Sequence, residues 1–203
     1  MKEVFLSTAY LAPVSYYSVL QLYDKTVIER HCNYIKQTYR NRCIIASTNG
    51  LLPLSIPIEK PETLKAQTKD IRIAQHGNWQ HLHWNAIISA YNSSPFFEYY
   101  EDDFRPFYEK PFHFLFDFNE ELRVLICDLL DIEPIVSYSE EYLPQQTFDF
   151  RELIHPKKEF ISSLPDITCK PYYQVFQQKY GFQPNLSVID LLFNMGPESL
   201  LIL

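Results

Sequence analysis

The first thirty residues alternate two short apolar runs with one amphipathic segment. Val4–Leu6 and Thr26–Glu29 have the apolar, β-branched character of buried strands. Val14–Tyr23 between them repeats large side chains at helical spacing. A strand, a helix and a second strand predict a parallel sheet, and such sheets bind ligands outside the carboxyl ends of their strands. We therefore expect residues 7–10 near one part of a crevice and residues 29–31 near another.

Residues 43–58 have the pattern of a β-hairpin. Cys43–Ala46 is apolar, and the Asn49-Gly50 pair is typical of a tight turn because both residues tolerate positive φ. After the turn, Leu52 to Ile58 alternates apolar residues with proline and serine, which predicts a half-buried strand at a sheet edge. Asp70–Ala74 is expected to be a further short strand.

A helical, aromatic-rich part is predicted at about residues 76–132. Its first helix starts at Trp79 with Asn78 as the N-cap, and a second is expected to start with Ser94 as cap and Pro95 at its first position. Asn119 is the expected cap of a third helix. The apolar positions of the first and third helices recur every three or four residues: Leu82, His83, Ala86, Ile87, Ala90, Tyr91, Leu122, Leu125, Ile126, Leu129 and Leu130.

The C-terminal residues predict shorter elements. Ile135–Tyr138 is expected to be a strand, whereas residues 140–170 are irregular and form either a long functional loop or a loosely held excursion. A short helix is expected over Tyr172–Tyr180. Ser187 with Asp190 resembles a capping box that opens a last helix. The fold class is therefore α/β, with a small mostly parallel sheet, a β-hairpin and a helical, aromatic-rich C-terminal half, in one domain over residues 1–203.

Composition narrows the function classes. The 203-residue chain has a net charge of −7 and no basic run, which disfavours general nucleic-acid binding, because that binding relies on positive charge. No apolar stretch has the length of a membrane span or of a secretory signal, so we expect a cytoplasmic protein. Neither of the two commonest phosphate-binding loops is present, and no cofactor is predicted.

The histidines do not predict a metal site. His81 and His83 lie two residues apart, so on a helix they diverge by about 200° and cannot reach one metal ion. The simplest interpretation places His83 in the core and His81 in solvent. His76 precedes the helix in a loop, where it is better placed to meet a ligand.

One basic cluster stands out, at Tyr34–Arg42. Arg40, Asn41 and Arg42 offer guanidinium and amide donors that suit a carboxylate or phosphate, and Lys36 adds a charge beside them. The alternative is a solvated turn whose arginines pair with acidic helices. The residues leave the two interpretations about even.

Six segments spread over nearly the whole chain occur together in one order: Tyr10-Leu11, Tyr39–Arg42, the Leu-x-Ile-Pro-Ile strand, Trp79-x-x-x-His83 with Tyr91, Phe97-Glu98 and Asn185–Asn194. In these segments and their order the chain resembles the WbqC-like family of bacterial proteins. The resemblance implies a cytoplasmic transferase-like protein of O-antigen and related surface-polysaccharide synthesis, which transfers glycine or another acyl group to an amino sugar. Many relatives carry His-Gln-Pro where this chain has Ser7-Thr8-Ala9, so the chain lacks a histidine in its first loop.

Two functional hypotheses follow. In the first, an acyl or aminoacyl transferase uses His76 or His31 as the base that removes a proton from the amine. The substrate-binding residues would then be the donors and the aromatic wall, namely Tyr10, Lys36, Arg40, Asn41, Arg42, Asn78, Trp79, His83 and Tyr91. In the second, the same groups hold an anionic metabolite, nucleotide or partner chain without turnover. Both hypotheses expect a small-molecule site where the Arg40–Arg42 turn meets the loop before Trp79, and they leave the oligomeric state open. A glycosidase-like set of carboxylates within Glu98–Asp103 is disfavoured, because these neighbours splay around a helix.

Overall fold

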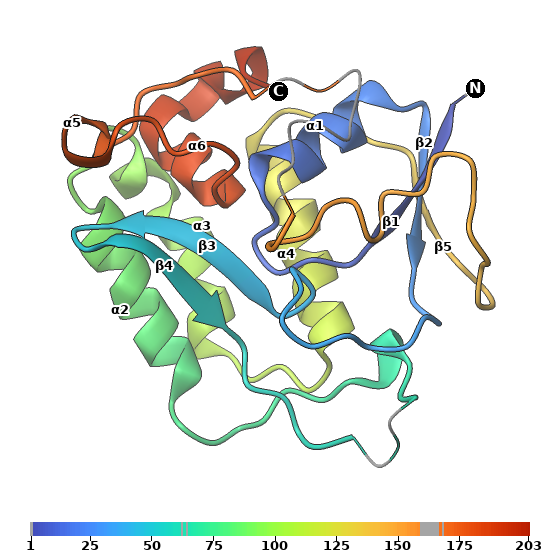
Figure 1. Cartoon of the computed structure of the whole chain (residues 1–203). Helices are drawn as coiled ribbons and strands as arrows, with labels where there is room; N and C mark the ends of the chain where they lie inside the picture. Colours follow the sequence, from blue (N-terminus) through green and yellow to red (C-terminus); the bar gives the residue numbers. More distant parts are fainter. Residues whose placement is uncertain (1, 62, 64, 159–166, 168) are drawn as a thin grey trace.

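A three-stranded parallel sheet forms one side of the molecule in the computed structural model, which describes residues 2–61, 63, 65–158, 167 and 169–203 (Figure 1). Its order is β1 (Glu3–Ser7), β2 (Lys25–Glu29), β5 (Val136–Tyr138), and α1 (Val14–Leu22) connects the first two strands. The predicted strand, helix, strand unit is confirmed. The register pairs the last residue of β1 with the last residue of β2, so both carboxyl ends meet at one edge of the sheet.

The predicted hairpin is also confirmed, as a separate antiparallel pair. It consists of β3 (Arg42–Ser47) and β4 (Gly50–Ser55), with φ of +99° at Gly50. Leu54 and Ile56 are buried while Pro53 and Ser55 are exposed, as the alternation predicts. The hairpin lies against α2 (Figure 1).

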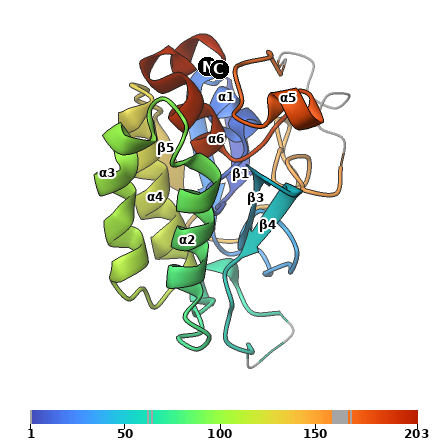
Figure 2. The same cartoon turned by 90° about the vertical axis from the view of Figure 1, so that its left-hand side faces the viewer.

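Three helices lie side by side in the middle of the chain: α2 (Trp79–Tyr91), α3 (Phe97–Glu109) and α4 (Leu115–Leu129) (Figure 2). Asn78 does occupy the N-cap of α2, but in a left-handed conformation without a side-chain capping bond. Two predicted helix starts are wrong. Ser94 precedes α3 by three residues, and its hydroxyl instead donates to the carbonyl of Tyr91 at the end of α2. Asn119 lies inside α4, four residues after its start.

The remaining elements are short: η1 (Thr68–Asp70), α5 (Gln177–Tyr180), α6 (Val188–Met195) and η2 (Gly196–Leu201). The predicted strand over Asp70–Ala74 is not formed; isolated bridges pair Arg72 with Phe114 and Ile73 with Ile58. The helix expected over Tyr172–Tyr180 is reduced to the four residues of α5. The start of α6 at Ser187 is confirmed, although the Ser187 side chain donates to the carbonyl of Leu11 and does not cap the helix.

A large apolar core joins most of these elements, and Val14, Tyr172 and Leu191 form a second, smaller cluster. The largest fully buried side chains come from both halves of the chain. They are Tyr10, Tyr17, Tyr91, Phe104, Phe118 and Phe193. The high aromatic content therefore mainly fills the interior. None of the helices in the described part of the chain combines the length and the apolar character needed to cross a bilayer.

Candidate functional site

A cavity of about 1010 Å³ lies beyond the carboxyl ends of the parallel strands. Its walls come from the residues that follow β2, from Arg40 and from a segment that follows β5. The lining residues are His31, Cys32, Asn33, Ile35, Arg40, Gln67, Tyr142, Gln145, Gln146, Thr147, Asp149, Arg151, Glu152 and Leu153. Within the irregular segment after β5, the residues that line the cavity fall between 142 and 153, whereas residues 159–166 and 168 lie outside the described part. The position agrees with the crevice expected for a parallel sheet.

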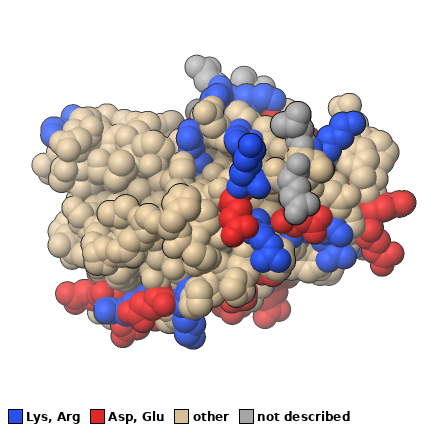
Figure 3. Space-filling view, turned by 90° about the horizontal axis from the view of Figure 1, so that it is seen from below, with Lys and Arg blue, Asp and Glu red and all other residues tan. Residues whose placement is uncertain are grey.

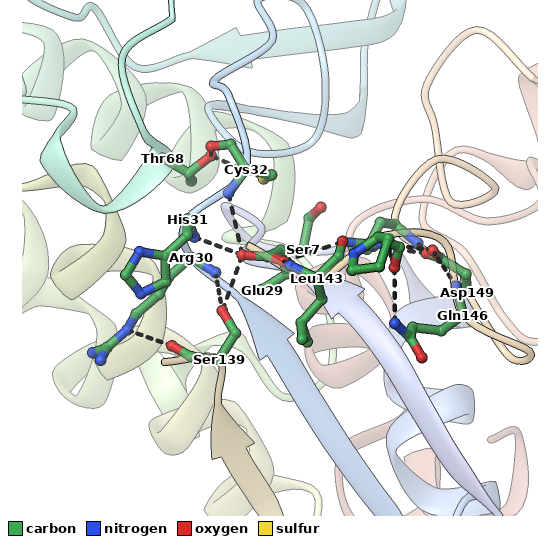
Figure 4. Close-up of polar contacts among 12 residues, drawn as sticks. Ser7, Glu29, Arg30, His31, Cys32, Thr68, Ser139, Leu143, Gln146 and Asp149 are labelled. Carbon is green, nitrogen blue, oxygen red and sulfur yellow. Dashed lines mark hydrogen bonds and ion pairs between the residues drawn. The ribbon is translucent and has the colours of Figure 1, made fainter. Parts of the chain in front are cut away.

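Glu29, the last residue of β2, ties two walls of this cavity together (Figure 4). Its carboxylate is fully buried and accepts the backbone amides of His31 at 2.6 Å and Cys32 at 3.1 Å. On the other side it accepts the amide of Leu143 at 2.7 Å and the guanidinium of Arg151 at 3.2 Å. A buried charge requires such partners, and here they fix the loop after β2 against the segment after β5.

Arg151 is fully engaged in holding its own segment. Its guanidinium donates to Glu29, to both carboxylate oxygens of Asp149 and to the carbonyls of Leu143 and Pro144. Burial by itself would raise the pKa of Asp149, but the hydrogen bonds from Arg151 outweigh it and the pKa is lowered. The hydrogen bond to Asp149 in turn raises the pKa of Arg151.

His31 lines the cavity with one ring nitrogen unpaired. Its Nδ1 lies 3.2 Å from Oε1 of Gln67. An amide oxygen can only accept, so the neutral tautomer that makes this hydrogen bond has its proton on Nδ1 and its lone pair on Nε2. Nε2 is buried and has no hydrogen-bond partner among the described residues. A backbone bridge between Asn33 and Gln67 fixes the two segments that hold this pair.

Arg40 also lines the cavity, and its side chain is only 3% exposed. Its Nη2 donates to Oγ of Ser7 at 2.8 Å and to Oε1 of Glu152 at 3.1 Å. Its carbonyl accepts the side-chain amide of Asn119 at 2.8 Å, which is what this asparagine does in place of capping α4. Arg40 is thereby fixed between β1 and α4, at the carboxyl edge of the sheet.

The other polar residues expected at the site lie elsewhere. Arg42 donates to Ser55 across the hairpin at 3.0 Å, and Asn41 donates to the carbonyl of Ile56 at 3.0 Å. Lys36 is exposed, as are His76 and Asn78 in the loop before α2, and none of these five lines the cavity. Of the polar residues singled out in the sequence, the cavity therefore brings together His31 and Arg40. The basic turn and the loop before Trp79 do not meet there.

The expected aromatic wall is part of the core. The Tyr10 hydroxyl and Nδ1 of His83 are hydrogen-bonded at 2.9 Å. The Trp79 ring packs edge-on against the His83 ring, with 5.2 Å between the ring centroids. Burial lowers the pKa of His83 to about 4, so this side chain is neutral near pH 7. The Tyr91 hydroxyl donates to the buried carboxylate of Asp190 at 2.9 Å. The interpretation that His83 packs in the core while His81 is solvated is confirmed.

Charge on the face at the carboxyl ends of β1 and β2 is mixed. These strands run downward in Figure 1, and the view from below shows lysine and arginine side chains interspersed with acidic ones (Figure 3). No three His, Cys, Asp or Glu side chains within the described ranges lie together as a metal site requires. The site that can be built from these residues is a polar cavity with two arginines, Arg40 and Arg151, and one imidazole, His31, whose Nε2 has no partner among the described residues.

Comparison of the sequence with known proteins assigns the chain to a family. The chain is 25% identical to an uncharacterized protein of Mycobacterium tuberculosis, Rv1507c, over 98% of this chain and 96% of that protein. No solved structure matches the chain significantly. The model of the WbqC-like protein family matches residues 8–162, which include β2, the hairpin, the three central helices and the described cavity walls up to residue 158. This chain therefore belongs to the WbqC-like protein family.

Proposed function

We propose that this protein is a cytoplasmic transferase that moves a glycyl or another acyl group onto the amine of an amino sugar during the synthesis of bacterial surface polysaccharide. Membership of the WbqC-like family supports the general assignment. The observation that carries the proposal is His31, whose Nδ1 is held by Gln67 while its buried Nε2 has no partner among the described residues. A buried polar atom without a partner needs an explanation, and a catalytic role is one.

The proposed reaction is amide formation by direct attack. The amine nitrogen of the sugar forms a bond to the acyl carbon, the bond from that carbon to the leaving group breaks, and a proton moves from the amine to Nε2 of His31. A base in this role accelerates such reactions by about 10²- to 10⁴-fold. Arg40, in the same cavity, would hold the anionic part of a substrate or stabilise the developing oxyanion.

The arrangement of the strands supports His31 in this role. Ser7 and Glu29 are partners at the ends of β1 and β2, and His31 follows two residues after Glu29. The first loop begins at Ser7, where many family members are expected to carry a histidine. A base on the loop after β2 would therefore reach the same edge of the sheet as one on the loop after β1.

A transfer assay tests the proposal. The protein is incubated with a glycyl thioester and a nucleotide-linked amino sugar, and the amide product is followed by mass spectrometry. We expect His31→Gln to lower the rate by at least about 10²-fold. His76→Gln tests the other histidine proposed as the base, and His81→Gln is the matched control, because this side chain is exposed and its hydrogen-bond partner among the described residues is its helix neighbour Asn85. Loss of activity in His76→Gln with an unchanged His31→Gln would contradict the assignment.

A binding protein without turnover is the second candidate. One observation favours it: no hydroxyl or thiol of the described residues bonds to Nε2 of His31, so the cavity holds no paired nucleophile and base. In this case the ligand would raise the melting temperature by mass action, while no donor and acceptor would give product. Measuring melting temperature and product in the same samples separates the two candidates.

A further inference from the structure

The two arginines of the cavity differ in how many of their donors are already used. Arg151 has partners for all three guanidinium nitrogens, and three of its hydrogen bonds go to the carboxylates of Glu29 and Asp149. A guanidinium has five N–H groups, and the two backbone carbonyls of its own segment take the rest. Arg151 therefore has little capacity left for a ligand.

Arg40 retains such capacity. Its Nε is buried without a partner among the described residues, and its Nη1 makes one long contact of 3.4 Å with Oγ1 of Thr38. Among the described residues, the carboxylate that pairs with Arg40 is that of Glu152, which contacts Nη2 through a single oxygen at 3.1 Å. A buried guanidinium needs a counter-charge, and Glu152 supplies it from the solvent side.

Glu152 is suited to be replaced. Its side chain is 53% exposed, so leaving Arg40 returns the carboxylate to water at small cost. A ligand carboxylate or phosphate can instead engage a guanidinium through two parallel N–H groups, which is the stronger geometry. The contact with Glu152 is thus of the same chemical kind as the expected ligand contact, but weaker.

We propose that Arg40 is the oxyanion site of this cavity, that Glu152 fills it in the unliganded protein, and that a carboxylate or phosphate of the ligand binds by displacing Glu152. This inference rests on the proposed function and deepens it, because it assigns an anionic group to the substrate. Glu152 then determines which ligands bind, because a ligand must compete with its carboxylate for Arg40. A group that binds Arg40 more weakly than Glu152 does is excluded.

Anion titrations at constant ionic strength test this inference without any transfer assay. Inorganic phosphate and acetate are titrated separately into the ¹⁵N-labelled protein, and dissociation constants are obtained from the amide shifts. The phosphate series stands for a nucleotide-linked substrate and the acetate series for a carboxylate substrate. Removing the competing charge in Glu152→Gln should tighten the binding of the preferred anion about two- to fivefold, the range expected for displacing a partly exposed ion pair.

Two further variants separate the site from general electrostatics. Glu140→Gln is the matched control: it removes one exposed carboxylate of the chain after β5 that does not line the cavity, and it should leave both constants unchanged. Arg40→Lys keeps the charge but loses the forked donors, and it should weaken anion binding at least about tenfold. If Arg40→Lys does not fold, the comparison of Glu152→Gln with Glu140→Gln still shows whether the anion displaces Glu152.

The outcomes distinguish this inference from the proposed function. Equal constants for Glu152→Gln and Glu140→Gln, or no saturable binding of either anion to Glu152→Gln, would overturn the displacement of Glu152. Tighter binding in Glu152→Gln together with no transfer product would sustain the oxyanion site and count against the transferase. Transfer that depends on His31, with no effect of Glu152→Gln on anion binding, would support the transferase and count against the oxyanion site.

Discussion

Asp190 is expected to make the protein lose stability as the pH rises from about 4 to about 6. Its carboxylate is 1% exposed and accepts hydrogen bonds from Tyr91 at 2.9 Å, Tyr172 at 2.8 Å and Gln174 at 3.0 Å. Burial raises the pKa from 3.8 to about 6, and the three donors lower it only in part. The net shift is about two units, which corresponds to about 3 kcal/mol at 1.36 kcal/mol per unit.

The sign of the pH dependence follows from whether the folded or the unfolded state holds the proton. Between the two pKa values, folded Asp190 keeps a proton that the unfolded chain has released, so the free energy of unfolding falls as the pH rises. The contribution is complete below the unfolded pKa and is lost above about 6. His83 acts in the opposite direction: burial lowers its pKa from 6.5 to about 4, so its contribution is present above 6.5 and is lost as the pH falls. In the unaltered protein the two effects oppose each other.

Asp190→Asn separates the two contributions. Urea unfolding followed by tryptophan fluorescence gives the free energy of unfolding at pH values from about 4 to about 7. We expect the difference between the unaltered protein and Asp190→Asn to change by about 3 kcal/mol across this range, with the variant relatively more stable at the higher pH. Asp102→Asn, at a side chain that is 94% exposed, is the control and should leave the profile unchanged. Parallel profiles for Asp190→Asn and the unaltered protein would refute the reasoning.

Three other outcomes are expected from the core. Tyr91→Phe removes the hydroxyl that donates to Asp190 and should cost about 1–3 kcal/mol in urea unfolding, and an unchanged midpoint would show that the bond contributes nothing. The ring protons of His83 should show no titration step in NMR spectra between about pH 5 and about pH 8, since its pKa is about 4, and a step there would mean that the ring is not buried. Gly196→Ala and Gly181→Ala both force a side chain into positive φ, at about 1–3 kcal/mol each. Gly196→Ala should lower the melting temperature further, because its new Cβ would lie 2.5 Å from a phenylalanine ring, whereas no atom of the described residues lies within 4 Å of a new Cβ at Gly181. Equal losses would contradict this packing.

Local pattern was sufficient for the elements whose neighbours in sequence are also their neighbours in space. The apolar run of β1, the helical spacing of α1 and the alternation in β4 each specify their own backbone and burial. The glycine after Asn49 likewise fixes the hairpin turn by itself. For these segments the side-chain period decides the structure, and the sequence displays that period directly.

Helix starts were less predictable, because capping residues have other partners available. Ser94 and Asn119 have the chemistry of N-caps, yet one closes the end of α2 and the other holds the carbonyl of Arg40 from inside α4. Asp190 has the position of a capping-box acid but accepts three donors from distant segments. Each of these side chains can satisfy its hydrogen bonds locally or at long range, and only the packed structure selects between the two.

The sequence by itself thus determined the α/β class, the parallel unit with the sheet edge at which a ligand is expected, and the short set of polar residues from which a site could be proposed. The tertiary structure decided which of them share a cavity: His31 but not His76, and Arg40 but not Arg42. It also made Glu29 the link between the cavity walls, through donors more than a hundred residues away along the chain, such as Ser139, Leu143 and Arg151. The physical reason is that a charge becomes buried, and its partners become fixed, only when segments remote in sequence close around it, and no periodicity of the chain records that event.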